Sequence, residues 1–449
     1  MKTSSTLLAS AIIAALGGFL FGFDTVVISG AEQKIQSLWS LSDTMHGLAT
    51  SSALWGTMLG ALLGGGPSDR YGRKKMLLVT GLLYLGSALW CALAQGVYSF
   101  MAARFLGGVG IGISSVVSPL YITEIAPPQL RGRLTGLFQF NLVFGILVAF
   151  LSNAFFARVG GEHAWRWMLG IVAAPALAYT LLCLVIPESP RWLINLRGDR
   201  AAGLRALRKI DVQASTAELE RMAEDIAHHE GELDSVGAKP TTAFWSWSHR
   251  RPILLAICVA FFNQFSGINA VLYFAPRIFE MTGLGEQAAL LTSAGVGVVN
   301  LIFTFVALSL IDRLGRRTLL YIGCVGYIIS LGLCAWAFFQ ESFRLVPYGI
   351  FAFIAAHAIG QGAVVWVLIS EIFPNEHRAS GQSLGCFTIW VSAAVITLLF
   401  PIAVANFAPG YIFAFFCGMM VLQLIWIWWQ VPETKGVPLE EIQSRLLAN

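Results

Sequence analysis

The sequence predicts an all-α membrane protein with twelve transmembrane helices in two six-helix repeats. Two observations carry this prediction. The chain of 449 residues is 56% hydrophobic and only 12% charged, and its mean hydropathy of +0.70 lies outside the range of soluble globular proteins. One charged phrase also occurs twice, as Asp69-Arg-Tyr-Gly-Arg-Lys-Lys75 and, 243 residues later, as Asp312-Arg-Leu-Gly-Arg-Arg317.

A second pair of charges follows each copy of this phrase. Glu124 lies seven residues before Arg131, and Glu371 lies seven residues before Arg378. This pair recurs at an offset of 247 residues, so the halves of the chain repeat one unit with a short insertion. Such a repeat in an apolar chain is typical of solute carriers, whose two halves move around a central site.

Twelve apolar runs are long enough to cross a hydrocarbon layer of about 30 Å. The first run is too long and too glycine-rich for a signal-peptide core, and no small-residue cleavage site follows it. We therefore interpret it as a retained span. The runs cover residues 7–28, 47–67, 76–95, 100–122, 134–156, 166–186, 253–275, 288–311, 318–339, 346–370, 381–405 and 410–430.

The runs also divide the chain into four parts. Residues 1–186 form an N-terminal six-helix bundle, 187–251 a cytoplasmic linker, 252–431 a C-terminal six-helix bundle and 432–449 a cytoplasmic tail. Helix formers of mixed charge at 199–233 favour short amphipathic helices in the linker, followed by the connector Gly237-Ala-Lys-Pro240. A merely solvated linker is the alternative.

The basic residues indicate the orientation. An even number of spans leaves both termini on one side, and assigning that side to the cytoplasm places 23 of the 29 Lys and Arg there. The net charge of +4 therefore reflects topology, and we expect no nucleic-acid partner. The chain has no Asn-x-Ser/Thr sequon, which favours a bacterial inner membrane.

The sequence shows no sign of a cofactor or metal site. The seven cysteines all lie in apolar runs and none forms a Cys-x-x-Cys pair, so small buried hydrophobic residues are the better interpretation. The spans contain neither a nucleophile–base pair nor a cluster of metal ligands. We therefore expect no enzyme, no cofactor and no metal.

Four further motifs carry a resemblance to a known family. They occur in order as Gly17-Gly-Phe-Leu-Phe-Gly-Phe-Asp24, Pro187-Glu-Ser-Pro-Arg-Trp-Leu193, Asn263-Gln-Phe-Ser-Gly-Ile-Asn269 and Pro432-Glu-Thr-Lys-Gly436. With the duplicated phrase, the chain resembles the sugar porter family of the major facilitator superfamily from residue 7 to about 440. The resemblance implies the major facilitator fold and a carrier that moves a monosaccharide across a lipid bilayer. We expect a monomer.

A monosaccharide carries hydroxyls around a ring with apolar faces, so its site needs amides and an aromatic plane. The seventh span supplies Asn263, Gln264 and Asn269, with Tyr273 one turn further. Gln264 and Asn269 are about 140° apart on a regular helix. Gly267 between them suggests local unwinding, which lets both amides face one cavity. Helix–helix hydrogen bonding is the alternative for each residue taken singly.

Three residues of later spans extend the candidate sugar site. They are Asn300 in the eighth span, Trp366 in the tenth and Trp390 in the eleventh. Together with Gln264 and Asn269 they match the sugar ligands of the family that the chain resembles.

The chain departs from the family at two positions. Some relatives have a sugar-binding glutamine where this chain has Ile146, and another where it has Ile389. His357 and Gln361 are one turn apart in the tenth span, so they are candidates to replace these amides. A buried structural role is the favoured interpretation of His357. The residue types suit glucose, galactose, a pentose and a polyol alike.

Asp24 and Arg104 are the acid and the base that we place within the membrane in the N-terminal half. An unpaired charge there is unfavourable, so each is expected to pair with the other. Burial disfavours an ionised carboxyl group and a nearby arginine favours it, so a change of conformation alters the balance. The resemblance favours a proton site, because proton-coupled members carry both residues. A static ion pair is the alternative.

A last group of charged residues lies at matching ends of the two repeats. The resemblance implies that they form a salt-bridge network that closes the cytoplasmic side in the outward-open state and breaks in the inward-open state. Simple anchoring of the topology explains the arginines but not the two glutamates at matching spacing. The predicted cytoplasmic gate consists of Arg73, Glu124, Arg131, Glu188, Arg191, Arg316, Glu371 and Arg378.

We therefore predict a monosaccharide importer that works by proton symport with alternating access. A uniporter without ion coupling is the nearest alternative, and Asp24 argues against it. A sugar sensor is expected to have a long cytoplasmic tail, whereas 18 residues follow Val431. An exporter of drugs or organic cations is expected to lack the motifs at 187–193 and 263–269.

Overall fold

The structure, a computed structural model, describes residues 5–127, 130–211, 214–236, 244–373 and 377–435. These residues form helices joined by turns and contain no strand. Eleven helical segments of this part are long and apolar enough to cross a membrane. The predicted all-α membrane fold is confirmed.

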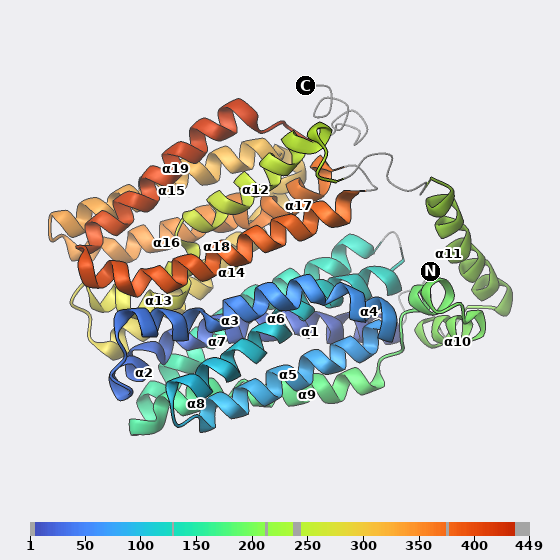
Figure 1. Cartoon of the computed structure of the whole chain (residues 1–449), viewed down its shortest axis with the longest axis horizontal. Helices are drawn as coiled ribbons and strands as arrows, with labels where there is room; N and C mark the ends of the chain where they lie inside the picture. Colours follow the sequence, from blue (N-terminus) through green and yellow to red (C-terminus); the bar gives the residue numbers. More distant parts are fainter. Residues whose placement is uncertain (1–4, 128–129, 212–213, 237–243, 374–376, 436–449) are drawn as a thin grey trace.

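The helices form two bundles that lie side by side (Figure 1). In the N-terminal bundle they are α1 (Ser5–Val27), η1 (Ile28–Gly30), α2 (Glu32–Leu38), α3 (Asp43–Leu63), α4 (Gly65–Tyr71), α5 (Arg73–Leu93), α6 (Val97–Ile125), α7 (Arg131–Val159), η2 (Gly161–His163), α8 (Ala164–Gly170) and α9 (Ala173–Val185). In the C-terminal bundle they are α12 (Arg250–Phe265), α13 (Ile268–Glu280), α14 (Glu286–Leu314), α15 (Arg316–Phe339), η5 (Phe343–Leu345), α16 (Val346–His357), η6 (Ala358–Gly362), α17 (Ala363–Ile372), α18 (Arg378–Asn406) and α19 (Pro409–Gln430).

The second predicted span falls on α3, which is not among the eleven apolar segments. Its hydropathy is lowered by buried polar residues, among them Thr50 and Thr57. The Thr50 hydroxyl donates to the His46 carbonyl at 2.9 Å and the Thr57 hydroxyl to the Ala53 carbonyl at 2.9 Å, so their polarity is satisfied within the helix. Because α3 packs along both α6 and α18, it takes the place of a spanning helix.

Glycines bring α1 and α7 into close contact. A Cβ added to Gly22 lies 1.9 Å from the Leu142 carbonyl oxygen, and one added to Gly18 lies 2.4 Å from that of Phe138. No larger side chain fits between these backbones, which is the use of small residues at helix contacts in membranes. The glycine-rich first span therefore places Asp24 in the interior of the N-terminal bundle.

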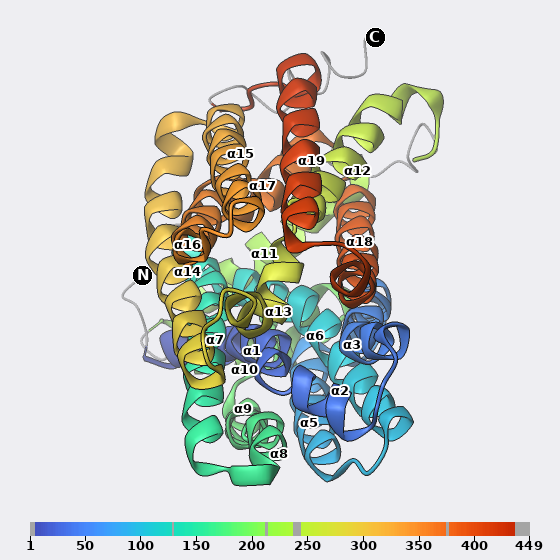
Figure 2. The same cartoon turned by 90° about the vertical axis from the view of Figure 1, so that its left-hand side faces the viewer.

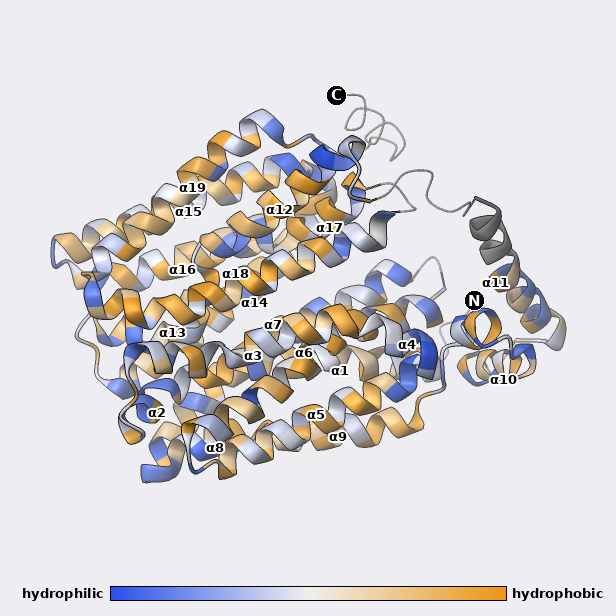
Figure 3. Cartoon of the chain, in the orientation of Figure 1, coloured by the Kyte–Doolittle hydropathy of each residue, from blue (hydrophilic) through white to orange (hydrophobic). Residues whose placement is uncertain are grey.

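The two ends of the bundles are distinct (Figures 1 and 3). We call the end with α4 and the described chain termini the terminal face, and the end with α2 and η2 the opposite face. Apolar residues dominate the middle of the long helices, and hydrophilic residues collect at these two ends (Figure 3). The arrangement is that of a multi-pass membrane protein.

The linker between the bundles forms η3 (Trp192–Leu196), α10 (Arg200–Ile210), α11 (Thr216–Val236) and η4 (Trp247–His249). At the start of α10, the Asp199 carboxylate accepts from the Ala202 N–H at 2.8 Å. Leu207 of α10 packs with Leu219 and Ala223 of α11, which gives the pair a small core of its own. Both helices lie at the terminal face (Figure 1). The connector 237–240 and the tail from residue 436 lie outside the described residues.

The bundles meet along two pairs of helices, α3 with α18 and α7 with α14 (Figure 2). Towards the opposite face these contacts are close. A Cβ added to Gly47 of α3 lies 2.1 Å from the Leu398 carbonyl oxygen of α18. The Gln287 side chain of α14 donates to the Ala154 carbonyl of α7 at 3.2 Å. The bundles are therefore in backbone-level contact at the opposite face.

Candidate functional site

The seventh predicted span is broken at Gly267, as the sequence predicts. α12 ends at Phe265, α13 begins at Ile268, and Gly267 between them has φ +89°. A residue with a side chain is strained at this φ, and a Cβ at Gly267 lies 2.7 Å from the Phe416 ring. The Ser266 hydroxyl donates to the Asn263 carbonyl at 2.7 Å, which satisfies an acceptor freed by the break.

The break brings the three amides of this span together. The Gln264 side-chain amide donates to Asn263 Oδ1 at 2.8 Å, and that of Asn269 donates to Gln264 Oε1. All three side chains are buried. A regular helix places Gln264 and Asn269 on different faces, so the hydrogen bond between them depends on the break. The result is a compact group of amide donors and acceptors at the start of α13.

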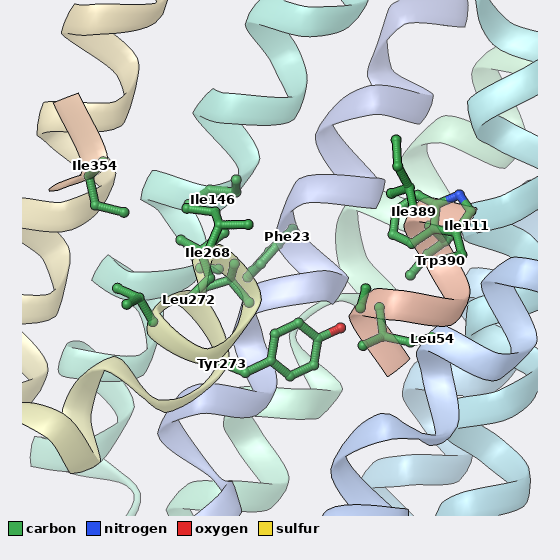
Figure 4. Packing of buried hydrophobic residues seen from close by; sticks show 14 of the residues in the cluster. Phe23, Leu54, Ile111, Ile146, Ile268, Leu272, Tyr273, Ile354, Ile389 and Trp390 are labelled. Carbon is green, nitrogen blue, oxygen red and sulfur yellow. The ribbon is translucent and has the colours of Figure 1, made fainter. Parts of the chain in front are cut away.

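Two polar atoms beside this group have no hydrogen-bond partner. Among the described residues, the Tyr273 hydroxyl and Trp390 Nε1 are both buried and unpaired. The Tyr273 ring projects from α13 toward Leu54 and Trp390 (Figure 4). The Trp390 ring packs against Phe21 of α1, with 5.6 Å between ring centroids. Both donors therefore lie where the two bundles meet, as expected for groups that a ligand satisfies.

The two isoleucines that depart from the family pattern lie in the same region. Ile146 on α7 lies near Ile268 and Leu272 of α13, and Ile389 is next to Trp390 on α18 (Figure 4). Ile146 and Ile389 are each 4% exposed. This part of the inter-bundle region is therefore apolar.

The other predicted sugar ligands differ in their burial. Asn300 on α14 is 8% exposed, whereas Trp366 on α17 is 38% exposed. The Trp366 backbone carbonyl accepts from the Gln382 side chain at 3.2 Å, which ties α17 to α18. Trp366 is thus partly exposed, whereas Trp390 is buried.

His357 and Gln361 point to other partners than the span-seven amides. His357 Nδ1 lies 2.6 Å from the Tyr327 hydroxyl of α15, and the Gln361 side chain donates to Gln423 of α19. Tyr327 also interacts with Ser266 at the break in span seven. These bonds favour the structural interpretation of His357, because His357 and Gln361 connect the tenth span to α15 and α19.

The predicted ion pair is present inside the N-terminal bundle. Arg104 of α6 donates from Nη1 to Asp24 Oδ1 at 3.0 Å and from Nη2 to the Asp24 carbonyl at 3.3 Å. Their side chains are 1% and 5% exposed. Among the described residues, Asp24 Oδ2 is buried without a hydrogen-bond partner. One carboxylate oxygen is thus paired with the arginine, while the other is a vacant acceptor.

A cluster of charges occupies the terminal face of the N-terminal bundle. Arg73 forms an ion pair with Glu124 at 2.9 Å. Glu188 Oε1 accepts from the backbone N–H groups of Arg73, Lys74 and Ser189 at 3.0, 3.0 and 2.9 Å. Glu188 follows α9, outside the spanning segments. Burial raises the pKa of its carboxyl group, and these hydrogen bonds offset only part of that effect.

The C-terminal bundle repeats this cluster at the same face. Arg316 pairs with Glu371 at 2.9 Å, and Glu433 accepts from the backbone N–H groups of Arg316 and Arg317 at 3.0 and 3.1 Å. Glu433 therefore has the role in this bundle that Glu188 has in the other. The sequence analysis omitted Glu433, although it stands 245 residues after Glu188 in the last family motif.

At the terminal face, the ion pairs of Arg73 with Glu124 and of Arg316 with Glu371 each join residues of one bundle. Arg131 and Arg191 line a cavity of about 310 Å³ beside Arg73 and Glu124 in the N-terminal half. The side chain of Arg378, the remaining predicted gate residue, lies outside the described part of the chain. The structure thus brings the described side chains of the predicted gate together as two separate clusters.

Two helical bundles with a broken helix, buried amides and a buried ion pair near their boundary define a secondary membrane transporter. The family "Sugar (and other) transporter" matches residues 10–446, and the chain belongs to this family. It is therefore a transporter and not an enzyme.

Several relatives in this family are named as sugar–proton symporters. The chain is 37% identical to the arabinose-proton symporter of Bacillus subtilis over 438 residues, covering 96% of this chain and 93% of that one. It is 33% identical to the D-xylose-proton symporter of Escherichia coli K12, covering 98% and 96%. A partially occluded inward-open structure of the E. coli xylose transporter superposes with a TM-score of 0.85 at 32% identity, covering 97% and 100%.

Proposed function

We propose that this protein imports a monosaccharide by proton symport with alternating access. One observation carries the proposal: the residues suited to sugar and those suited to a proton lie within reach of one another. Trp390, a predicted sugar ligand, packs against Phe21 of α1, the helix that also bears Asp24, with 5.6 Å between ring centroids. The similarity to proton symporters for arabinose and xylose supports the same conclusion.

The sugar binds between the bundles at the break in span seven. Gln264 and Asn269 exchange the hydrogen bond that now joins them for bonds to sugar hydroxyls, assisted by Asn263 and Tyr273. Asn300 supplies a further amide, and Trp390 and Trp366 supply indole surfaces for the apolar faces of the ring. Ile146 and Ile389 add apolar contact where other members carry glutamine, and so they shape the preference among sugars. His357 and Gln361 support this site through Tyr327 and Gln423.

Asp24 carries the proton. Its unpaired Oδ2 is the position for the proton, and Arg104 stabilises the carboxylate after the proton has left. A carboxyl group that changes its charge in step with the two access states couples proton entry to sugar entry.

The terminal face is cytoplasmic, since it carries most of the basic residues. The bundles, residues 1–186 and 252–431, move against one another as units while the linker and tail remain in the cytoplasm. The protein acts as a monomer in the lipid bilayer, because the proposed sugar and proton sites are both formed by residues of one chain.

The charge clusters at the terminal face form the cytoplasmic gate. In the present conformation Arg73 pairs with Glu124 and Arg316 with Glu371, each within its own bundle, while the bundles touch at the opposite face. We expect the clusters to pair across the bundles when the terminal face closes, with Arg131, Arg191 and Arg378 as partners of Glu371 and Glu124.

Charge reversal at Glu371 is expected to disfavour closure of the terminal face, because the closed state loses its inter-bundle pairs. Spin labels at Gly132→Cys and Ser380→Cys, both exposed in this structure, report the separation of the bundles there. In Glu371→Lys the population at long distance is expected to rise. Glu224→Lys, at an exposed ion pair of α11, is the matched control. An unchanged distance distribution in folded Glu371→Lys protein assigns these charges to topology alone.

A panel of sugars tests the proposed substrate class. Calorimetry on purified protein with hexoses, pentoses and polyols is expected to give saturable binding for a subset of them. The same sugars are expected to accumulate in vesicles that carry an inward proton gradient. A protein that binds no sugar in the panel, yet binds organic cations, contradicts the proposal.

A further inference from the structure

A buried cluster of charges joins the two bundles at the opposite face, away from the sites described above. Glu32 begins α2, His46 lies in the first turn of α3, and Arg277 lies near the end of α13. Arg277 donates from Nε to Glu32 Oε1 and from Nη2 to Glu32 Oε2, both at 3.0 Å. Glu32 and His46 are completely buried. We call these three residues the opposite-face latch.

His46 is the second partner of the same carboxylate. Its Nε2 atom lies 2.8 Å from Glu32 Oε2. Its ring stands edge-on to Phe274 of α13, with 6.2 Å between ring centroids. Glu32 and His46 belong to the N-terminal bundle, whereas Arg277 and Phe274 belong to the C-terminal bundle. Glu32 therefore has one partner that departs when the bundles separate and one that stays.

We propose that the opposite-face latch closes this face in the transport cycle and that protonation of His46 releases it. The proposal rests on the alternating access proposed above. When the bundles separate, Glu32 loses the bidentate bond from Arg277, and His46 remains as the partner of its carboxylate. A protonated His46 compensates that charge, whereas a neutral one does so only weakly.

The closed state, by contrast, disfavours a proton on His46. There the Arg277 guanidinium already neutralises Glu32, and a proton on His46 places a second positive charge beside it. Protonation therefore stabilises the separated bundles relative to the closed ones, and by linkage separation favours the proton. Acid at the opposite face thus returns the carrier to the state that is open to that side, which suits a symporter that takes its proton there.

The surrounding charges leave Glu32 as the carboxylate that His46 meets directly. Gln36 binds both Asp43 and the latch, since its amide donates to Asp43 at 3.3 Å and its oxygen accepts from Arg277. On α6, Arg104 lies deeper and is paired with Asp24. The described side chains of α18, from residue 380 on, carry no charge. The other described titratable or charged residues towards this end are Lys34 on α2, Arg158 on α7, Glu162 and His163 in η2, Arg166 on α8, Glu280 on α13, Glu286 on α14, Glu341 after α15 and Arg344 in η5.

Pulsed electron–electron double resonance, which measures distances between spin labels, tests the latch directly. Spin labels at Ser37→Cys on α2 and Ala288→Cys on α14, both exposed at the opposite face, report the separation of the bundles. The labelled protein also carries Asp24→Asn, so that protonation of Asp24 does not contribute to the pH response. Its seven native cysteines are replaced, so that no spin label attaches to them. On lowering the pH from about 8 to about 5, the ratio of long to short distances is expected to rise, by up to about tenfold per pH unit for one proton.

Variants of His46 separate this account from its alternatives. His46→Gln is expected to abolish the pH response, and His46→Lys to favour the long distance at every pH. His163→Gln, at an exposed histidine of the same face, is expected to keep the full response. A distribution that ignores pH, or a full response in folded His46→Gln protein, overturns the proposal. A response that depends on His46 in a protein that moves no protons with sugar leaves the latch standing and refutes symport alone.

Discussion

Replacing Gln264 or Asn269 with alanine is expected to weaken sugar binding about five- to 150-fold, equivalent to about 1–3 kcal/mol. Both amides are buried and bonded to one another across the break at Gly267. When a sugar takes the place of this bond, truncation of either residue leaves sugar hydroxyls and the remaining amide without partners. Calorimetry on folded protein, with a sugar that the native chain binds, measures the loss.

Asn406→Ala is the matched control for this prediction. The Asn406 side chain is an exposed amide at the end of α18 that donates only to its own helix, to the Ile402 carbonyl at 2.7 Å. Its removal is expected to leave sugar affinity unchanged. Native affinity in both Gln264→Ala and Asn269→Ala removes span seven from the sugar site.

Replacing Asp24 with asparagine is expected to abolish uphill sugar accumulation while sugar binding and sugar-for-sugar exchange persist. Asparagine resembles the protonated carboxyl group but neither binds nor releases a proton. One proton that moves inward down 100 mV releases about 2.3 kcal/mol, which sustains an accumulation ratio on the order of fifty. The variant is expected to lose this factor and only to equilibrate the sugar across the membrane.

Two assays in vesicles separate these activities. Uptake under an imposed proton gradient measures accumulation, and exchange at equal pH measures movement of the loaded carrier. Asp225→Asn, at an exposed carboxylate of α11, is expected to behave as the native chain does in both. Full accumulation by Asp24→Asn protein reduces the Asp24–Arg104 pair to a structural role.

Much of the fold follows from patterns that are local in sequence. The apolar runs predict the spans because each must satisfy its backbone within the membrane. Gly267 predicts the break in span seven, since glycine tolerates the positive φ that the structure shows there. The pairing of Arg73 with Glu124 and of Arg316 with Glu371 follows from the internal repeat, because equivalent positions of the two halves occupy equivalent places.

Contacts between elements distant in the chain could not be predicted in this way. The spacing of His357 and Gln361 places both on one side of a helix, but it does not show that this side meets α15 and α19. Glu32 and Arg277 are 245 residues apart and lie in no repeated motif, so only the packed bundles reveal their bond. His46 lies in a polar stretch of α3, the predicted span whose hydropathy is too low for it to be among the eleven apolar segments.

The direct test of coupled transport is whether sugar moves protons. Native protein in vesicles is placed in a weakly buffered medium without an imposed pH gradient or membrane potential, and sugar is added outside. The account predicts that the medium becomes alkaline as sugar enters, that the change depends on Asp24, and that a protonophore abolishes it. Sugar entry with no change of external pH, unaffected by a protonophore, contradicts symport and identifies a uniporter.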